Sequence, residues 1–234
     1  MDFIGAKNTY KDNAIVQKKM AKKLVLETVS KAGNNFNDIF EIGSGTGLLT
    51  DEIIANFNFK RLFLNDLNEN FTGRTCEKYF KGDISKIKFE DNFKADLIIS
   101  NAVFQWIDDK EGLFSKLFSL IRQNGVLAFT YFGCKNFCQI KDISGFGLNY
   151  EDIRPVIKKT GFSVLYFEEE LETLYFKDVQ KILEHIKLTG VGTNSNHLWT
   201  KSKYEAFKER YLESFSDKNG VELTYHPQYF VLGK

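Results

Sequence analysis

The sequence is poor in the residues that cross-linked, rigid or metal-bound proteins use. It contains 2 prolines, 3 cysteines and 3 histidines among 234 residues. Cys76, Cys134 and Cys138 are odd in number and form no Cys-x-x-Cys pair, so neither a disulfide framework nor a zinc cluster is indicated. The histidines show no His-Glu-x-x-His spacing. We therefore expect reduced cysteines and no metal site.

Long apolar runs and an excess of charge of one sign are also missing. No run approaches the roughly 18 apolar residues of a membrane span, and the opening MDFIGAKNTYKDNA lacks the apolar region of a signal peptide. Lys and Arg total 32 against 31 Asp and Glu, a net charge of +1, which does not favour nucleic acid as a partner. We expect a cytoplasmic monomer with no membrane or nucleic-acid partner.

The composition is that of an ordinary globular protein. Hydrophobic residues make up 43% and charged residues 27% of the chain, which is enough apolar material for a sizeable core. The length fits one domain with an insertion better than two enzymatic domains. We therefore expect a single domain over residues 1–234.

Apolar runs of strand length alternate with amphipathic helical patterns in the first part of the chain. Such alternation implies right-handed crossovers and a mainly parallel sheet covered on both faces. The sequence therefore predicts a doubly wound α/β fold. The helical patterns lie at 14–29, 48–57 and 111–121, and the strand patterns at 39–42, 61–66, 78–80, 95–100 and 125–132.

The second part of the chain has a different organisation. Residues 163–176 alternate like one long strand, and a last strand is expected at 221–232. We interpret 177–219 as a helical insertion between these two strands, which we expect to form an antiparallel pair at the sheet edge. Helices are expected at 178–188 and 201–215 within the insertion, and at 152–160 before it, with Pro155 in the first turn.

A glycine-rich loop follows the first predicted strand. It reads Glu41-Ile-Gly43-Ser44-Gly45-Thr-Gly47, which matches neither the dinucleotide fingerprint G-x-G-x-x-G nor a P-loop. An acid before three alternate glycines resembles motif I of the class I S-adenosylmethionine (SAM) methyltransferases. Glycines allow a ligand to approach the backbone closely. The resemblance implies that this loop, Ser44 included, binds SAM, with Glu41 facing its amino group.

Two acids follow the next strands in order. Asp66 ends the second strand, where a carboxylate accepts both hydroxyls of a ribose, and Leu67 follows it. Gly82-Asp83-Ile84 follows the third strand; in this methyltransferase class an acid there meets the adenine amino group and the apolar residue packs on the ring. Singly, either acid is more often a turn residue. Together with the glycine loop they predict a nucleoside pocket.

The segment Ser100-Asn101-Ala102-Val-Phe-Gln-Trp106 closes the fourth strand. It resembles the corresponding segment of methyltransferases that act on carboxylic acids. The resemblance implies that Asn101 and Ala102 lie on the sulfonium side of the cofactor and that Trp106 lines the acceptor pocket. Simple packing of Trp106 under the following helix is the competing interpretation.

Nearly the whole chain resembles the malonyl-acyl-carrier-protein O-methyltransferases of biotin synthesis. That resemblance implies a seven-stranded, Rossmann-like sheet, SAM as cofactor with S-adenosylhomocysteine as product, and a malonyl thioester on acyl-carrier protein as substrate. It also implies that the insertion 177–219 forms part of an acceptor lid. The matching segments are Tyr10 with 14–17, 41–50, 100–106, 125–133, 168–170, 183–190 and 223–226.

The family-specific segments also supply candidates for the two sides of the site. Tyr10 and Gln17 are the candidates that close the cofactor side, and Lys187, Tyr225 and His226 are the candidates for the acceptor carboxylate. A malonyl carboxylate, with a pKa near 4, is ionised at neutral pH. No general base is therefore needed, and catalysis rests on positioning and on a dry pocket.

A basic surface is expected on the insertion, because the carrier protein in this family is acidic. Residues 177–210 contain seven Lys or Arg against four Asp or Glu. Lys177, Lys181 and His185 repeat every four residues and are expected to form a stripe along one helix face. An ordinary solvated helix face explains the same pattern.

Two other functions stay open at this point. A methyltransferase of a small free acid, such as an aconitate-like tricarboxylate, needs the same cofactor site but no docking surface. A methyltransferase-like subunit that binds SAM or a partner without turnover is the other alternative, although the complete set of cofactor acids argues against it.

Overall fold

The computed structural model describes residues 13–69, 72–144, 150–189 and 200–234. They form two compact units. The larger unit is built from Val16–Phe132, Asp152–Glu169 and Gln228–Lys234. The smaller unit is built from Gly133–Glu151 and Glu170–Pro227 together with residues 13–15.

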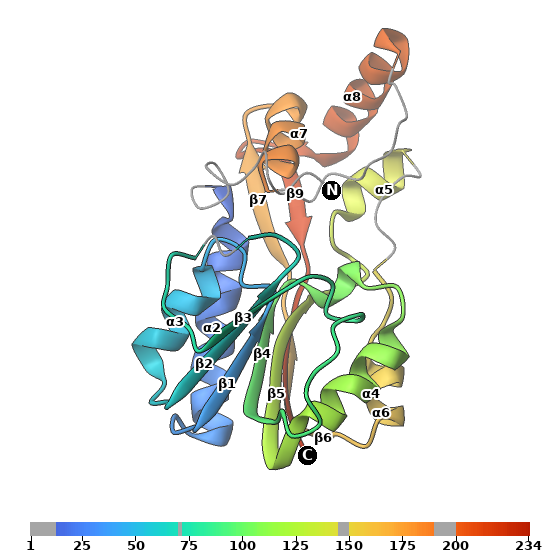
Figure 1. Ribbon diagram of the computed structural model, residues 1–234. Helices are drawn as coiled ribbons and strands as arrows, with labels where there is room; N and C mark the ends of the chain where they lie inside the picture. Colours follow the sequence, from blue (N-terminus) through green and yellow to red (C-terminus); the bar gives the residue numbers. More distant parts are fainter. Residues whose placement is uncertain (1–12, 70–71, 145–149, 190–199) are drawn as a thin grey trace. The chain divides into compact units, whose positions relative to one another are not determined.

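A seven-stranded sheet forms the centre of the larger unit (Figure 1). Its strand order is β3-β2-β1-β4-β5-β10-β6. The pairs β1–β2, β1–β4, β2–β3 and β4–β5 are parallel, whereas β10 pairs antiparallel with β6 at the sheet edge. The predicted fold class is confirmed. The strands are β1 Asp38–Ile42, β2 Arg61–Asp66, β3 Lys78–Lys81, β4 Ala95–Asn101, β5 Ile121–Phe132, β6 Ser163–Glu169 and β10 Pro227–Gly233.

Helices cover both faces of this sheet, as Figure 1 shows. Alternate strand residues point to opposite faces, so Ile39 packs with the helices α2 (Ile15–Ala32) and α3 (Leu48–Asn56). Its neighbour Phe40 packs with α4 (Lys110–Leu120) and α6 (Arg154–Lys159). The sequence predicts all four helices to within a few residues.

The ends of the helices follow from local chemistry. The carboxylate of Asp109 accepts a hydrogen bond from the Gly112 N–H at 2.8 Å and starts α4. Pro155 lies in the first turn of α6, where the missing N–H costs no helical hydrogen bond. This confirms the predicted position of Pro155.

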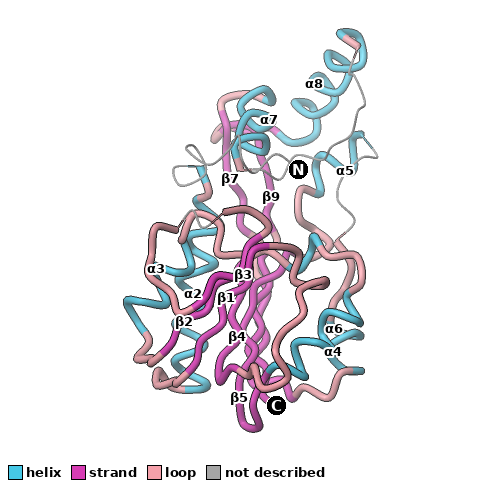
Figure 2. Tube along the Cα trace, in the orientation of Figure 1, coloured by secondary structure: helices cyan, strands magenta, loops and turns pink. Residues whose placement is uncertain are grey.

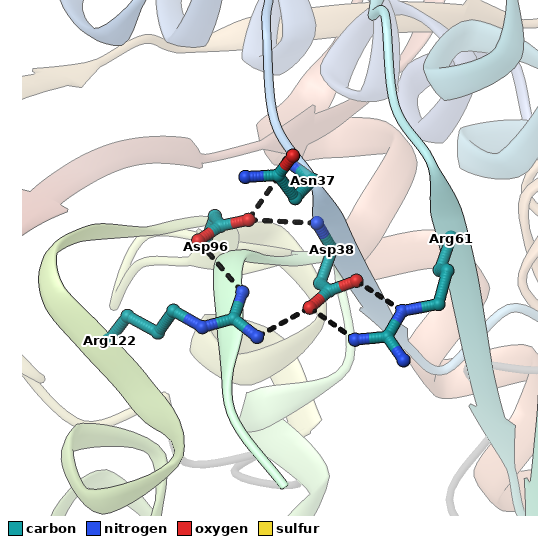
Figure 3. A network of polar contacts seen from close by, with 5 residues as sticks. All are labelled: Asn37, Asp38, Arg61, Asp96 and Arg122. Atoms are coloured by element: carbon teal, nitrogen blue, oxygen red, sulfur yellow. Dashed lines mark hydrogen bonds and ion pairs between the residues drawn. The ribbon is translucent and has the colours of Figure 1, made fainter.

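The amino-terminal edge of the sheet is closed by an ion-pair network (Figure 3). Asp38 is buried and accepts two hydrogen bonds from Arg61, at 2.6 and 2.7 Å, and one from Arg122 at 2.5 Å. Arg122 also donates to Asp96 at 2.8 Å, and Asp96 accepts the backbone N–H groups of Asn37 and Asp38. The network therefore joins the starts of β1, β2, β4 and β5.

Among the described residues, the smaller unit contains a three-stranded antiparallel sheet in the order β7-β9-β8 and three helices. Figure 2 colours the helices cyan and the strands magenta. The strands of the smaller unit are β7 Glu172–Phe176, β8 Ser216–Asp217 and β9 Gly220–Tyr225. Its helices are α5 Cys138–Ser144, α7 Val179–Leu188 and α8 Lys201–Phe215. The two helices expected within 177–219 are present, while the short helix α5 was not predicted.

The two long strands expected at 163–176 and 221–232 are each divided in two. The first breaks at Glu170 and Leu171, and the second at His226. In each case one half pairs in the seven-stranded sheet and the other in the three-stranded sheet. The alternating pattern continues through a break of one or two residues, so it cannot reveal that the chain changes sheets.

Candidate functional site

The polar residues singled out in the sequence meet at the carboxyl edge of the seven-stranded sheet. The registers pair Ile42 with both Asn65 and Ser100, and Asp66 with Lys81. The segments that leave β1, β2, β3 and β4 therefore emerge side by side. Ligands of open α/β sheets bind at this edge.

The glycine loop is fixed by backbone hydrogen bonds to β2. The N–H groups of Gly43 and Ser44 donate to the carbonyl of Asn65, at 2.8 and 2.9 Å. The N–H of Gly45 donates to Oδ2 of Asp66 at 2.9 Å. The loop is therefore bonded directly to Asp66, the residue predicted to bind the ribose. Gly47 then begins α3.

The three glycines of the loop share a left-handed backbone but differ in what surrounds them. All have positive φ, at +74° for Gly43, +48° for Gly45 and +89° for Gly47. A Cβ on Gly43 would lie 2.2 Å from Cγ2 of Val103, so packing requires glycine there. A Cβ on Gly45 would meet nothing closer than a carbonyl oxygen at 4.0 Å. Gly45 therefore borders open space, in which a ligand can approach the backbone.

Replacement of Gly45 by alanine tests this space. We expect Gly45→Ala to lower the affinity for S-adenosylhomocysteine at least about tenfold, since the methyl group occupies the approach to the loop. The matched control is Gly33→Ala, because Gly33 has φ +79° and no atom within 4 Å of its Cβ position. Both variants should lose about 1 kcal/mol of stability from the left-handed backbone. Equal affinity of the two variants, measured by calorimetry, would show that the loop carries no ligand.

The two acids after β2 and β3 differ in their hydrogen bonds. Asp66 is half-buried, and its second oxygen accepts from the N–H of Asn68 at 3.0 Å. Hydrogen bonds from Ser85 hold the pKa of Asp83 below its usual range, so Asp83 is a carboxylate at neutral pH. Of the apolar neighbours, Leu67 is exposed whereas Ile84 is buried in the core beside α4.

Glu41 is a fully buried carboxyl group. Its Oε2 accepts the Thr50 hydroxyl at 2.6 Å, and its Oε1 has no hydrogen-bond partner among the described residues. Burial raises the pKa of Glu41 to about 8. An unpaired, buried acceptor is costly, and a cationic amino group would satisfy it.

Because the pKa of Glu41 is raised, we expect a cationic ligand that binds at Glu41 to release a proton. At pH 7 Glu41 holds a proton, and pairing with the amino group of S-adenosylhomocysteine requires the carboxylate. We expect release of about one proton per ligand at pH 7 and affinity that increases with pH up to about 8. Calorimetry in buffers of different ionisation enthalpy measures this release. The variant Glu41→Gln should show no proton release. The same release in that variant would show that Glu41 does not bind the amino group of S-adenosylhomocysteine.

Asn101, Ala102 and Gln17 meet at the end of β4. The amide Nδ2 of Asn101 donates to the main-chain oxygen of Gln17 at 3.0 Å. Its Oδ1 accepts the Thr130 hydroxyl at 2.7 Å. Thr130 was not predicted as a site residue, since a single threonine inside an apolar strand gives no sequence signal; its register with Asn101 is the relevant feature.

The acceptor-side candidates lie in different parts of the chain. Trp106 ends the 3-10 turn Phe104–Trp106 of the larger unit and is half-buried. Tyr225 and His226 are buried in the smaller unit, where His226 Nδ1 accepts the Lys135 N–H at 3.2 Å. Lys187 is exposed on α7. Tyr10 lies outside the described residues.

The expected stripe of Lys177, Lys181 and His185 is wrong. Lys177 precedes α7, and His185 is buried with its Nε2 2.8 Å from the Tyr225 hydroxyl. Burial also lowers the pKa of His185. Lys181 is exposed and pairs with Glu184 at 2.7 Å. The buried face of α7 is formed by the apolar residues Val179 and Ile182, and His185 lies on that same face.

Within the described residues, no helix combines the length and apolarity that a bilayer crossing requires. Among the same residues, no three side chains of the His, Cys, Asp and Glu types gather as a metal site would need.

Solved structures resemble this chain in fold. A protein from Bacillus halodurans, provisionally named a methyltransferase, superposes with a TM-score of 0.65 at 12% identity, covering 90% of this chain and 98% of that one. Phosphoethanolamine N-methyltransferase 2 of Haemonchus contortus, solved in complex with S-adenosyl-L-methionine, gives a TM-score of 0.54 at 18% identity, covering 91% of this chain and 52% of that chain.

Sequence comparisons give closer relatives. Residues 40–129 match the profile described as a methyltransferase domain. The malonyl-acyl-carrier-protein O-methyltransferase of Calditerrivibrio nitroreducens is 40% identical over 96% of this chain and 91% of its own length. The protein of the same name from Prosthecochloris aestuarii is 34% identical over 96% of this chain and 88% of its own length. This chain therefore belongs to the malonyl-acyl-carrier-protein O-methyltransferase family.

Proposed function

We propose that the protein transfers a methyl group from SAM to the free carboxylate of a malonyl thioester on acyl-carrier protein, the reaction that begins pimeloyl and biotin synthesis. The observation that carries the proposal is 40% identity, over nearly the full length of both chains, to a relative of that name. Acids and glycines at the carboxyl edge of the sheet support the cofactor part of the proposal.

The residues at this edge fit SAM. Gly45 borders open space, and the free oxygen of Glu41 fits a cationic amino group. We assign Asp66 to the ribose and Asp83 to the adenine. When bound, SAM supplies an activated methyl group on a positively charged sulfur.

The chain has little proton chemistry to perform on this substrate. A malonyl carboxylate is ionised at neutral pH, so no side chain needs to act as a general base. The protein's contribution is to orient the two reactants and to exclude water from the carboxylate, and positioning alone can lower a barrier by roughly 7 to 11 kcal/mol. We assign Trp106 to the wall of the acceptor pocket.

We further infer that the helices α7 and α8 carry a docking surface for the carrier protein. Exposed basic side chains on or beside these helices, such as Lys177, Lys187 and Lys203, support the inference. Attraction between such side chains and an acidic partner speeds association and fixes its orientation.

Charge reversal tests the docking surface. We expect Lys177→Glu combined with Lys181→Glu to raise the KM for malonyl-carrier protein about fivefold or more, most strongly at low salt, because opposite charges steer the encounter. The affinity for S-adenosylhomocysteine should not change. The control is Lys18→Glu with Lys22→Glu on α2, two exposed lysines of the larger unit. An unchanged KM would remove Lys177 and Lys181 from the docking surface.

Mass spectrometry tests the function itself. Malonyl-acyl-carrier protein incubated with the protein and SAM should gain one methyl group, and base hydrolysis of the ester should remove it. Acetyl-acyl-carrier protein, which has no free carboxylate, is the matched control and should gain nothing. Methylation of free malonate or aconitate in preference to the carrier-bound acid would favour the small-acid alternative, and S-adenosylhomocysteine binding without any turnover would favour a non-catalytic subunit.

A further inference from the structure

The turn after β4 has an unusual backbone. Ala102 has φ +54°, in the left-handed region that residues with a Cβ avoid. Both of its main-chain groups are bound by side chains: its N–H donates to Thr130 Oγ1 at 2.9 Å, and its carbonyl accepts from Gln105 Nε2 at 2.7 Å. A conformation that costs free energy persists when surrounding contacts hold it in place.

One hydroxyl group serves two neighbouring residues of this turn. Thr130 is fully buried in β5 and lies opposite Asn101 in the register. Its Oγ1 accepts from Ala102 and donates to Asn101 Oδ1, which uses the single donor of a hydroxyl and one of its acceptor sites. This contact fixes which end of the Asn101 amide is oxygen, so that Nδ2 faces the carbonyl of Gln17.

The same turn also determines the contact with the glycine loop. Val103 follows Ala102 and packs closely on Gly43. A Cβ added to Gly43 would lie 2.2 Å from Cγ2 of Val103. A change of conformation at Ala102 would therefore move two side chains: Val103, which packs against the glycine loop, and Asn101.

We propose that Thr130 and Gln105 are positioning residues, which hold the turn at Ala102 and thereby keep Val103 in place against the loop Gly43–Gly47 and Asn101 in place beside Gln17. This inference rests on the proposed function in one respect, that the loop binds SAM. Neither Thr130 nor Gln105 touches the cofactor in this scheme; each acts through Ala102.

Replacement of Thr130 by valine removes the hydroxyl at nearly constant volume. We expect Thr130→Val to weaken S-adenosylhomocysteine binding about tenfold, and Thr130→Ser to restore it to within about twofold. The matched control is Thr28→Val, since Thr28 is also fully buried and its hydroxyl bonds a carbonyl of its own helix at 2.7 Å. Thr28→Val should lower stability without changing ligand affinity.

A measurement without ligand separates this inference from the proposed function. The Ala102 amide proton, observed by NMR, should exchange with solvent about tenfold faster in Thr130→Val and return to the wild-type rate in Thr130→Ser. Unchanged exchange together with unchanged affinity would overturn the positioning role. If the wild-type protein does not bind S-adenosylhomocysteine, the proposed function is overturned instead. In that case, faster exchange of the Ala102 amide in Thr130→Val would still support the role of Thr130 in fixing the turn.

Two further variants cover the case in which Thr130→Val does not fold. Gln105→Met removes the donor to the Ala102 carbonyl at a half-buried position and should weaken binding in the same direction. Ala102→Gly makes the left-handed backbone accessible without strain. In that background Gln105→Met should cost less affinity than in the wild type, and an equal cost in both backgrounds would contradict the role assigned to the turn.

Discussion

Asp66→Ala is expected to weaken the binding of S-adenosylhomocysteine by at least about 100-fold. A carboxylate that accepts both hydroxyls of a ribose forms two charge-assisted hydrogen bonds, each contributing about 1.5 to 3 kcal/mol. Two such bonds correspond to a factor of about 100 to 10,000 in affinity. Isothermal titration calorimetry on the full chain measures the loss.

Part of this effect arises from the loop, because Asp66 also accepts the Gly45 N–H at 2.9 Å. An analogue of S-adenosylhomocysteine that lacks the ribose 2′-hydroxyl separates the two contributions. It should bind the wild type more weakly than the parent ligand does, but bind Asp66→Ala about as well as the parent ligand. Asp91→Ala, at an exposed acid, is the control. If Asp66→Ala discriminates between the two ligands as the wild type does, Asp66 does not bind the ribose.

The second large effect concerns stability and the opposite edge of the sheet. Asp38→Asn is expected to lower the free energy of unfolding by about 2 to 3 kcal/mol, since a buried carboxylate shared by two arginines is replaced by a neutral amide. Arg61 and Arg122 are 49% and 36% exposed, so water can solvate them after the change. This exposure keeps the cost below that of a fully buried pair. Chemical denaturation at pH 7 measures the difference.

The same network predicts a pH dependence. Hydrogen bonds from Arg61, with those from Arg122, hold the pKa of Asp38 below its usual range despite burial. A lowered pKa contributes stability above the unfolded value of about 3.9, and the contribution is lost as pH falls through the folded value. The stability gap between wild type and Asp38→Asn should therefore be constant near neutrality and narrow below about pH 4.

Asp152→Asn is the matched control for this experiment. Asp152 also binds an arginine, Arg154, through two hydrogen bonds of 2.8 Å, but its side chain is 46% exposed. Exposed pairs contribute between about 0 and 1 kcal/mol. Equal losses in Asp38→Asn and Asp152→Asn would show that burial of the network contributes nothing.

Local sequence patterns were sufficient for much of the fold. The helices α2, α3, α4, α7 and α8 are amphipathic or begin at recognisable caps, and their predicted bounds agree with the structure to within a few residues. The positions of Glu41, the glycine loop and Asp66 could also be predicted, because each follows a strand whose apolar run is complete in itself.

Other features depend on residues far apart in the chain and could not be predicted. The division of 163–176 into β6 and β7 depends on which strand each half pairs with, and both halves alternate alike. His185 was expected on an exposed stripe, yet it lies on the buried side of α7 against Tyr225. A spacing of four residues identifies a common face of a helix but not which face is buried.

By itself, the sequence determined the α/β class, the order of the elements, and the glycine loop and acids from which we propose a nucleoside pocket, because these follow from periodicity and from residues close together in the chain. The tertiary structure decided that Glu41 is buried with one unpaired oxygen, that Thr130 holds the turn at Ala102, and that Asp38 joins four strands. The physical reason is that burial and hydrogen bonding at these positions are set by partners many residues away, which come together when the parallel strands pair in register.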